Sequence, residues 1–108
     1  MMKTLFQAVA LAVAALAVPA QADEAAQMAL GKKLFTTTTP ACALCHTLKD
    51  AGAEGAIGPV FDELQPDAAR VTRALRDGIG SMPSFRAGLS DAEIAAIALY
   101  VSRASRQH

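Results

Sequence analysis

The clearest pattern of apolar and polar positions lies near the C-terminus. Four apolar residues recur there at the spacing of one helical face: Ile94, Ile97, Ala98 and Val101. Such spacing predicts an amphipathic helix. The segment Ser90-Asp91-Ala92-Glu93 matches a capping box, and Leu89 and Ile94 are placed as a hydrophobic staple around it. The last helix should therefore begin directly after Ser90.

Two further helices are indicated upstream. The apolar positions within residues 24–35 predict a first helix, which four threonines and Pro40 should end because β-branched residues and proline disfavour its continuation. A later helix is predicted over residues 66–77, since Pro66 suits a first turn and Gly78 suits a stop. No segment shows the strict alternation of a half-buried strand, so the pattern predicts an all-α fold with three to four helices.

The N-terminal region has the pattern of an export signal. A short basic start with Lys3 precedes an almost wholly apolar run over residues 5–18, and Ala20-Gln21-Ala22 follows as an A-x-A cleavage site. We predict a signal peptide over residues 1–22 and a single mature domain over residues 23–108. The alternative is an uncleaved anchor helix, but this run is shorter than the roughly 20 apolar residues that span a bilayer. The mature chain should therefore be exported to the periplasm, without stable membrane insertion.

Composition narrows the classes of partner. The 108 residues include ten basic and ten acidic side chains, so no basic excess suggests a nucleic-acid partner.

The hydrophobic core should be small. Only 21 of the 86 residues predicted for the mature chain have bulky apolar side chains, because the 53% of hydrophobic residues in the whole chain includes 25 alanines. Domains of this size bury little core and often depend on a disulfide, a metal or a cofactor.

The two cysteines offer three interpretations. They stand in Cys42-Ala43-Leu44-Cys45-His46, which matches the attachment sequence of c-type haem: each thiol adds to a vinyl group and the adjacent histidine binds the iron. A thiol–disulfide oxidoreductase would instead need a low-pKa cysteine after a strand. A structural zinc site needs four ligands, and beyond these three residues the chain offers only the terminal His108. Export and the small core favour haem.

A sixth iron ligand is available in a loop. Electron-transfer haems commonly pair histidine with methionine or with a second histidine. Met28 falls in the first predicted helix, where core packing is the simpler role, and His108 is the last residue, where side chains are usually exposed. Met82 lies between two glycines and Pro83, which break regular structure. A thioether on such a loop could lie across the face of a porphyrin opposite His46.

These motifs together resemble those of class I c-type cytochromes. The resemblance covers about residues 28–103 and rests on Cys42-x-x-Cys45-His46, Gly58-Pro59 and Met82-Pro83 before a final helix. It implies one covalent haem c per chain, wrapped by the helices. It also implies that the Pro59 carbonyl accepts a hydrogen bond from the proximal imidazole.

In this family the first and last helices cross at a close contact between a glycine and an aromatic residue. Gly31 and Tyr100, with Phe35 beside them, fit that pairing. Arg70, Arg73 and Arg86 are candidate partners for the haem propionates, with nothing in the sequence to choose among them.

The function implied is one-electron transfer rather than catalysis. A haem with both His46 and Met82 bound has no open position for a substrate, and the soft thioether favours ferrous iron, so a fairly high potential is expected. Two alternatives remain: a five-coordinate haem sensor or peroxidase if Met82 is not a ligand, and a thiol–disulfide oxidoreductase if haem is absent.

The partners should be redox proteins of the periplasm. Residues 36–48 and 78–85 carry no Asp, Glu, Lys or Arg, which predicts a neutral docking surface beside the haem edge and brief, largely apolar encounters. Residues 42–85 also resemble small cytochromes that accept electrons from periplasmic sulfite dehydrogenases. A periplasmic dehydrogenase as donor, and an oxidase or another cytochrome as acceptor, are therefore the partners predicted.

Overall fold

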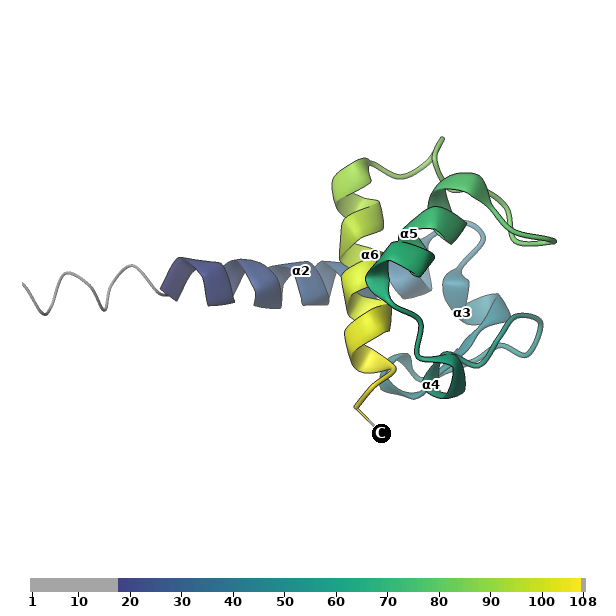
Figure 1. The fold of residues 1–108 in the computed structure, drawn as a ribbon, viewed down its shortest axis with the longest axis horizontal. Helices are drawn as coiled ribbons and strands as arrows, with labels where there is room; N and C mark the ends of the chain where they lie inside the picture. Colours follow the sequence, from purple (N-terminus) through teal and green to yellow (C-terminus); the bar gives the residue numbers. More distant parts are fainter. Residues whose placement is uncertain (1–17, 108) are drawn as a thin grey trace, which may run out of the picture.

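The computed structural model describes residues 18–107, and side chains from residue 22 onward. In chain order its elements are α2 (Val18–Thr37), α3 (Cys42–Cys45), β1 (Thr47–Leu48), the 3-10 helix η1 (Lys49–Ala51), β2 (Ala53–Glu54), α4 (Phe61–Leu64), α5 (Ala68–Asp77) and α6 (Asp91–Ala104). Helices α2, α5 and α6 are the long ones, and the short elements lie on the side of the body away from the start of α2 (Figure 1). No helix in the described part is both long and apolar enough to cross a membrane.

The prediction of an all-α fold with three to four helices is only partly right. Residues 18–107 contain five α-helices and a two-stranded antiparallel sheet, in which Thr47 pairs with Glu54 and Leu48 with Ala53. Each strand has two residues and both α3 and α4 have four, so none is long enough to leave a periodic signal. The strands are joined by η1 and by Gly52, whose φ of 62° lies in the left-handed region that glycine adopts without strain.

Helix α2 is longer than predicted at both ends. It already includes Val18, the first described residue, rather than starting at residue 24, because the alanines of this segment are strong helix formers. It also continues through Thr37 rather than stopping at Phe35. The hydroxyls of Thr36 and Thr37 donate to the Lys33 carbonyl oxygen at 3.0 and 2.8 Å, which lets threonine follow the helical path.

The helix passes through the predicted cleavage point after Ala22, while most of the predicted signal peptide lies outside the described residues. The signal peptide therefore stays a prediction.

The core forms where α2 crosses α6. A Cβ on Gly31 would lie 2.2 Å from the Ala96 carbonyl oxygen and 2.6 Å from the Tyr100 Cβ, so only glycine permits this approach. The Phe35 ring packs edge-on against Tyr100, with ring centroids 6.1 Å apart. The contact that the family resemblance implied between Gly31, Tyr100 and Phe35 is thus confirmed.

Helices α5 and α6 begin with side-chain caps. The capping box predicted at Ser90 and Glu93 is present in full, and Ile94 is buried. The start predicted for the earlier helix was wrong by two residues: Asp67 is the N-cap, accepting a hydrogen bond from the Arg70 N–H, so Pro66 precedes the helix. Aspartate wins this position because its carboxylate satisfies a free N–H group of the first turn.

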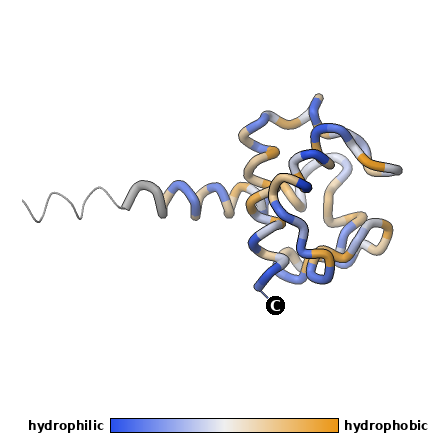
Figure 2. The backbone as a smooth tube through the Cα atoms, in the orientation of Figure 1, coloured by the Kyte–Doolittle hydropathy of each residue, from blue (hydrophilic) through white to orange (hydrophobic). Residues whose placement is uncertain are grey.

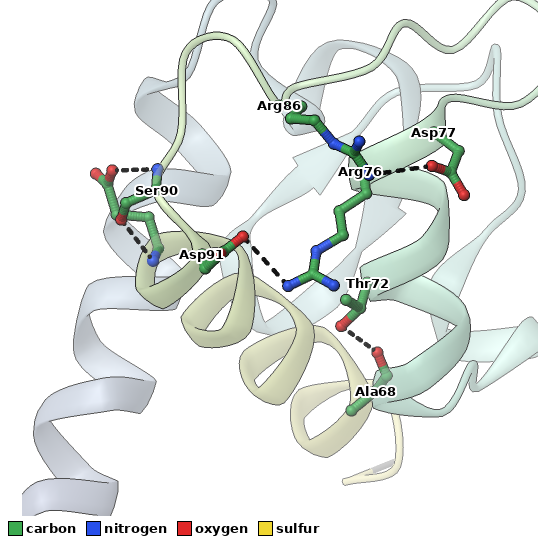
Figure 3. Close-up of polar contacts among 8 residues, drawn as sticks. Ala68, Thr72, Arg76, Asp77, Arg86, Ser90 and Asp91 are labelled. Carbon is green, nitrogen blue, oxygen red and sulfur yellow. Dashed lines mark hydrogen bonds and ion pairs between the residues drawn. The ribbon is translucent and has the colours of Figure 1, made fainter.

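An ion pair ties these two helices together. Arg76 of α5 contacts Asp91 in the first turn of α6 at 3.2 Å, and Figure 3 shows it beside the Ser90 cap and the Arg86–Asp77 pair. Beyond α5, Gly78 adopts a φ of 72° and starts the loop of residues 78–84. This loop and the loop of residues 55–60 carry hydrophobic positions on the same side of the body (Figure 2). Ile57 and Ile79 on these two loops are largely exposed.

Candidate functional site

Helix α3 presents both thiols from a single turn. Cys42 and Cys45 are three residues apart, and the His46 N–H closes the turn by donating to the Cys42 carbonyl oxygen at 3.0 Å. Residues at this spacing lie on neighbouring positions of a helix surface. Both cysteines are free thiols and half-buried. The turn therefore presents both thiols from one short helix, with His46 immediately after them.

The environment of the thiols does not fit a thiol–disulfide oxidoreductase. Burial raises the pKa of the Cys42 thiol, whereas the attacking cysteine of such an enzyme needs a lowered pKa. The Thr38 hydroxyl, 3.7 Å from the Cys42 sulfur, only partly offsets that effect. The element directly before the motif is α2, where this class of enzyme would place a strand.

The donor set does not fit zinc either. Across residues 18–107, no group of three or more His, Cys, Asp or Glu side chains is arranged to hold a metal ion. The other histidine of the sequence, His108, lies outside the described residues. Of the three interpretations of the cysteines, the covalent haem is the one that the local structure accommodates.

The imidazole of His46 is buried and in contact with a backbone carbonyl oxygen. Its side chain is only 7% exposed, and Nδ1 lies 2.9 Å from the Pro59 carbonyl oxygen. This is the contact that the family resemblance implied for Pro59. An Nδ1–H that donates to this carbonyl leaves Nε2 as the free lone pair, which is the form that binds a metal.

The loop before Pro59 fits closely against α3 because it contains two glycines. A Cβ on Gly58 would lie 2.5 Å from Cε1 of His46, and a Cβ on Gly55 would lie 2.6 Å from the backbone nitrogens of Cys45 and His46. The Gly58 N–H also donates to the Cys45 carbonyl oxygen at 2.6 Å. Gly58 was predicted only as half of the Gly-Pro pair, and no role was predicted for Gly55. The spacing of two glycines just before that proline was the signal available.

Phe61, for which the sequence predicted no role, contacts the face of the imidazole. Phe61, the first residue of α4, stacks on the His46 ring with centroids 4.1 Å apart and an interplanar angle of 13°. An isolated phenylalanine in a segment without periodicity gives no sign of such a contact. His46 is therefore surrounded by a hydrogen-bond acceptor, a glycine backbone and an aromatic ring.

Met82 lies in a loop anchored to the end of α5. Its backbone exchanges two hydrogen bonds with Ile79, at 2.9 and 3.0 Å, which close a tight turn. The Ser84 hydroxyl donates to the Arg76 carbonyl oxygen and the Phe85 N–H donates to that of Leu75, so the base of the loop is fixed. The Met82 side chain is half-buried and packs against the core. It is thus placed on a loop separate from the turn that holds His46.

The other residues considered as iron ligands or propionate partners are Met28 and three arginines. Met28 packs against the core from α2, as its helical position suggested. Arg70 and Arg73 are exposed on α5, and Arg86 forms an ion pair with Asp77 at 3.4 Å. The assignment of a propionate partner among these arginines stays a prediction.

The residues present fit a covalently attached haem. Two free thiols on one turn suit its two vinyl groups, and the imidazole with Nδ1 held by Pro59 leaves Nε2 for the iron. Gly58 leaves the space that the imidazole fills. Cys42, Cys45 and His46 would hold the group on one side, and Met82 is a thioether donor on a loop of its own.

Comparisons with known proteins agree with this fit. The family model described as cytochrome c oxidase, cbb3-type, subunit III matches residues 26–101. The crystal structure of the c-type cytochrome SorU from Sinorhizobium meliloti is 52% identical, with a TM-score of 0.71, and the match covers 73% of this chain and 91% of that one. A search of the curated proteins found no match. The chain therefore belongs to this family of c-type cytochromes, as a small class I member with covalently attached haem c.

Proposed function

We propose that this electron carrier works in the periplasm, with haem bound through thioether links at Cys42 and Cys45 and with His46 and Met82 as axial ligands. The observation that carries the proposal is the setting of His46. This residue directly follows the turn with two free thiols, and its Nδ1 lies 2.9 Å from the Pro59 carbonyl oxygen. When bound, haem supplies a one-electron change between ferrous and ferric iron.

The protein's own residues set the properties of that change. The hydrogen bond from Nδ1 to Pro59 fixes the tautomer of His46 and makes Nε2 a stronger donor. A thioether from Met82 is a soft ligand that favours ferrous iron, and burial disfavours the extra charge of the ferric state. These two effects support a fairly high potential, and a haem with both axial positions filled leaves none for a substrate.

Exposed aliphatic side chains support a docking surface near the thiols. Leu44 of α3, Ile57 and Ile79 are 66%, 77% and 68% exposed. They belong to α3 and to the two loops that flank the site, and residues 36–48 and 78–85 carry no charged side chain. Large exposed apolar side chains grouped together are typical of interaction sites. The surface suits a small, brief and largely apolar encounter with a redox partner.

The donor proposed is a periplasmic dehydrogenase, and the acceptor is an oxidase or another cytochrome. A sulfite dehydrogenase is the first donor to test, because residues 42–85 resemble the small cytochromes that such enzymes reduce. The 52% identity to the c-type cytochrome SorU supports a small carrier of this general kind.

The ligation is tested by optical absorption of the ferric holoprotein. A sulfur bound to ferric low-spin haem gives a characteristic weak band at long wavelength. Met82→Ala should abolish this band, whereas Met28→Ala, which removes a core thioether of the same kind, should retain it. If the band survives Met82→Ala, Met82 is not the ligand. If the wild-type protein lacks the band, the five-coordinate sensor or peroxidase becomes the better hypothesis.

A further inference from the structure

Phe61 contacts the flat face of the His46 imidazole. The proposed function assigns Nε2, an atom in the plane of this ring, to the iron. The two ring centroids are 4.1 Å apart and the planes differ by 13°, so the contact is a parallel stack rather than an edge contact. Phe61 begins α4 and follows Pro59 by two residues. One short segment therefore supplies both the acceptor for Nδ1 and a flat surface for the ring.

The Phe61 ring is itself held from behind. Phe35 of α2, which is fully buried, packs edge-on against Phe61 with centroids 6.1 Å apart, and it makes a similar contact with Tyr100 of α6. The Tyr100 hydroxyl donates to the Asp50 carboxylate at 2.5 Å. A row of rings thus connects His46 to the crossing of α2 and α6, where Gly31 permits the close approach of the two helices.

The hydrogen bond to Pro59 does not by itself fix the plane of the imidazole. A hydrogen bond to a carbonyl oxygen tolerates a broad range of angles, so the ring can still tilt about the line from Nδ1 to the oxygen. Rotation about a bond from Nε2 to iron would likewise leave the ring plane undetermined. A flat ring stacked at 13° restrains the rotation that the hydrogen bond leaves free.

We infer that Phe61 is a positioning residue that fixes the plane of the His46 imidazole about its bond to the haem iron. The inference rests on the proposed axial role of His46. It assigns to the α4 segment a part in setting the electronic environment of the haem, in addition to its part in core packing. A side chain that only filled space would affect stability without affecting the orientation of the imidazole.

The test uses the full holoprotein and a readout that reports orientation. In the ferric state, the paramagnetic shifts of the haem-methyl protons depend on the direction of the axial-ligand planes. Phe61→Leu, which keeps an apolar side chain but removes the flat ring, should change the spread of these shifts. Phe61→Tyr, which restores the ring, should keep the wild-type pattern. Ile97→Val removes a methyl group from the buried face of α6 and should lower the melting temperature without changing the pattern.

A wild-type pattern in Phe61→Leu, with only a lowered melting temperature, would overturn the inference. A pattern that changes equally in Ile97→Val would also overturn it, since it would mean that any loosening of the core has this effect. A second measurement needs no variant: the reduced, diamagnetic protein should give nuclear Overhauser contacts between the His46 and Phe61 rings, and their absence would contradict the stack.

Failure of the proposed function gives a different result from failure of this inference. If the wild-type protein shows no low-spin haem with histidine and methionine ligands, the proposed function falls, and the role of Phe61 falls with it. If that haem is present and Phe61→Leu leaves the haem-methyl shifts unchanged, only the role of Phe61 is wrong.

Discussion

The two proposed axial ligands are held by the fold in different ways. His46 is buried, and it meets a carbonyl, a glycine backbone and an aromatic ring at once. Met82 is half-buried on a loop whose base is fixed to α5 but whose tip is closed only by two backbone hydrogen bonds with Ile79. The comparison indicates that the polypeptide restrains the His46 side chain from several directions, while it holds Met82 mainly through the backbone of its loop.

The largest expected effect comes from filling the space beside His46. In Gly58→Ala the new Cβ would lie 2.5 Å from the imidazole, so the ring must shift or the loop must open. Overpacking of this kind costs about 1–3 kcal/mol of the free energy of unfolding, measured by thermal or chemical denaturation of the holoprotein. Gly88→Ala is the control, because a Cβ there meets nothing within 4 Å. Equal stability of the two variants would contradict the tight fit.

Gly80, on the loop that carries Met82, should affect stability through its backbone conformation rather than through a close contact. Gly80 has a φ of 56°, but a Cβ there meets nothing within 4 Å. Gly80→Ala should therefore cost only the strain of a left-handed alanine, about 1–2 kcal/mol. The long-wavelength absorption band should weaken more readily on heating than in the wild-type protein, since the strain falls on the loop that carries Met82. A larger loss of stability than in Gly58→Ala would reverse the comparison between the two sides.

The aromatic row behind His46 predicts a dependence on alkaline pH. Burial, together with the Asp50 carboxylate, raises the pKa of the Tyr100 hydroxyl above its ordinary value. As the pH rises, the folded state therefore keeps the Tyr100 hydroxyl proton after the unfolded state has lost it. The contribution of Tyr100 to the free energy of unfolding is complete below a pH of about 10 and decreases as the pH rises beyond it.

Tyr100→Phe removes both the hydrogen bond and this titration. It should cost about 1 kcal/mol of the free energy of unfolding at neutral pH and make the alkaline decline shallower, as followed by denaturation at several pH values. An unchanged alkaline decline in the variant would show that Tyr100 does not cause it.

The smallest effect concerns salt. Because the exposed Leu44 and Ile79 lie in the uncharged stretches 36–48 and 78–85, electron exchange with the natural partner should depend only weakly on ionic strength. Stopped-flow rates measured from low to moderate salt would show this directly. A steep fall in the rate would mean that charged residues elsewhere on the surface guide the encounter.

Local signals predicted the long elements and the chemical motif. The cap at Ser90 and the stop at Gly78 follow from residue types at helix ends, whereas the crossing at Gly31 followed from the family resemblance; all three are present. The two-residue strands and the four-residue helices were missed because each spans only about one period of its pattern, which is too short for a repeat to show.

The surroundings of His46 were predicted only in part. The Pro59 contact followed from a family resemblance, and its distance is 2.9 Å. The roles of Gly55 and Phe61 depend on how one loop folds back onto α3, and that arrangement has no counterpart in local spacing. Contacts between segments distant in the sequence depend on how all the elements pack together, so they cannot be predicted from the type of a single residue.

Mass spectrometry of the exported protein under denaturing conditions tests the attachment of haem most directly. Thioether links through Cys42 and Cys45 survive denaturation, so the account predicts a chain beginning at Asp23 that carries the mass of one haem. A chain that loses all haem on unfolding, or that never carried it, would contradict the account.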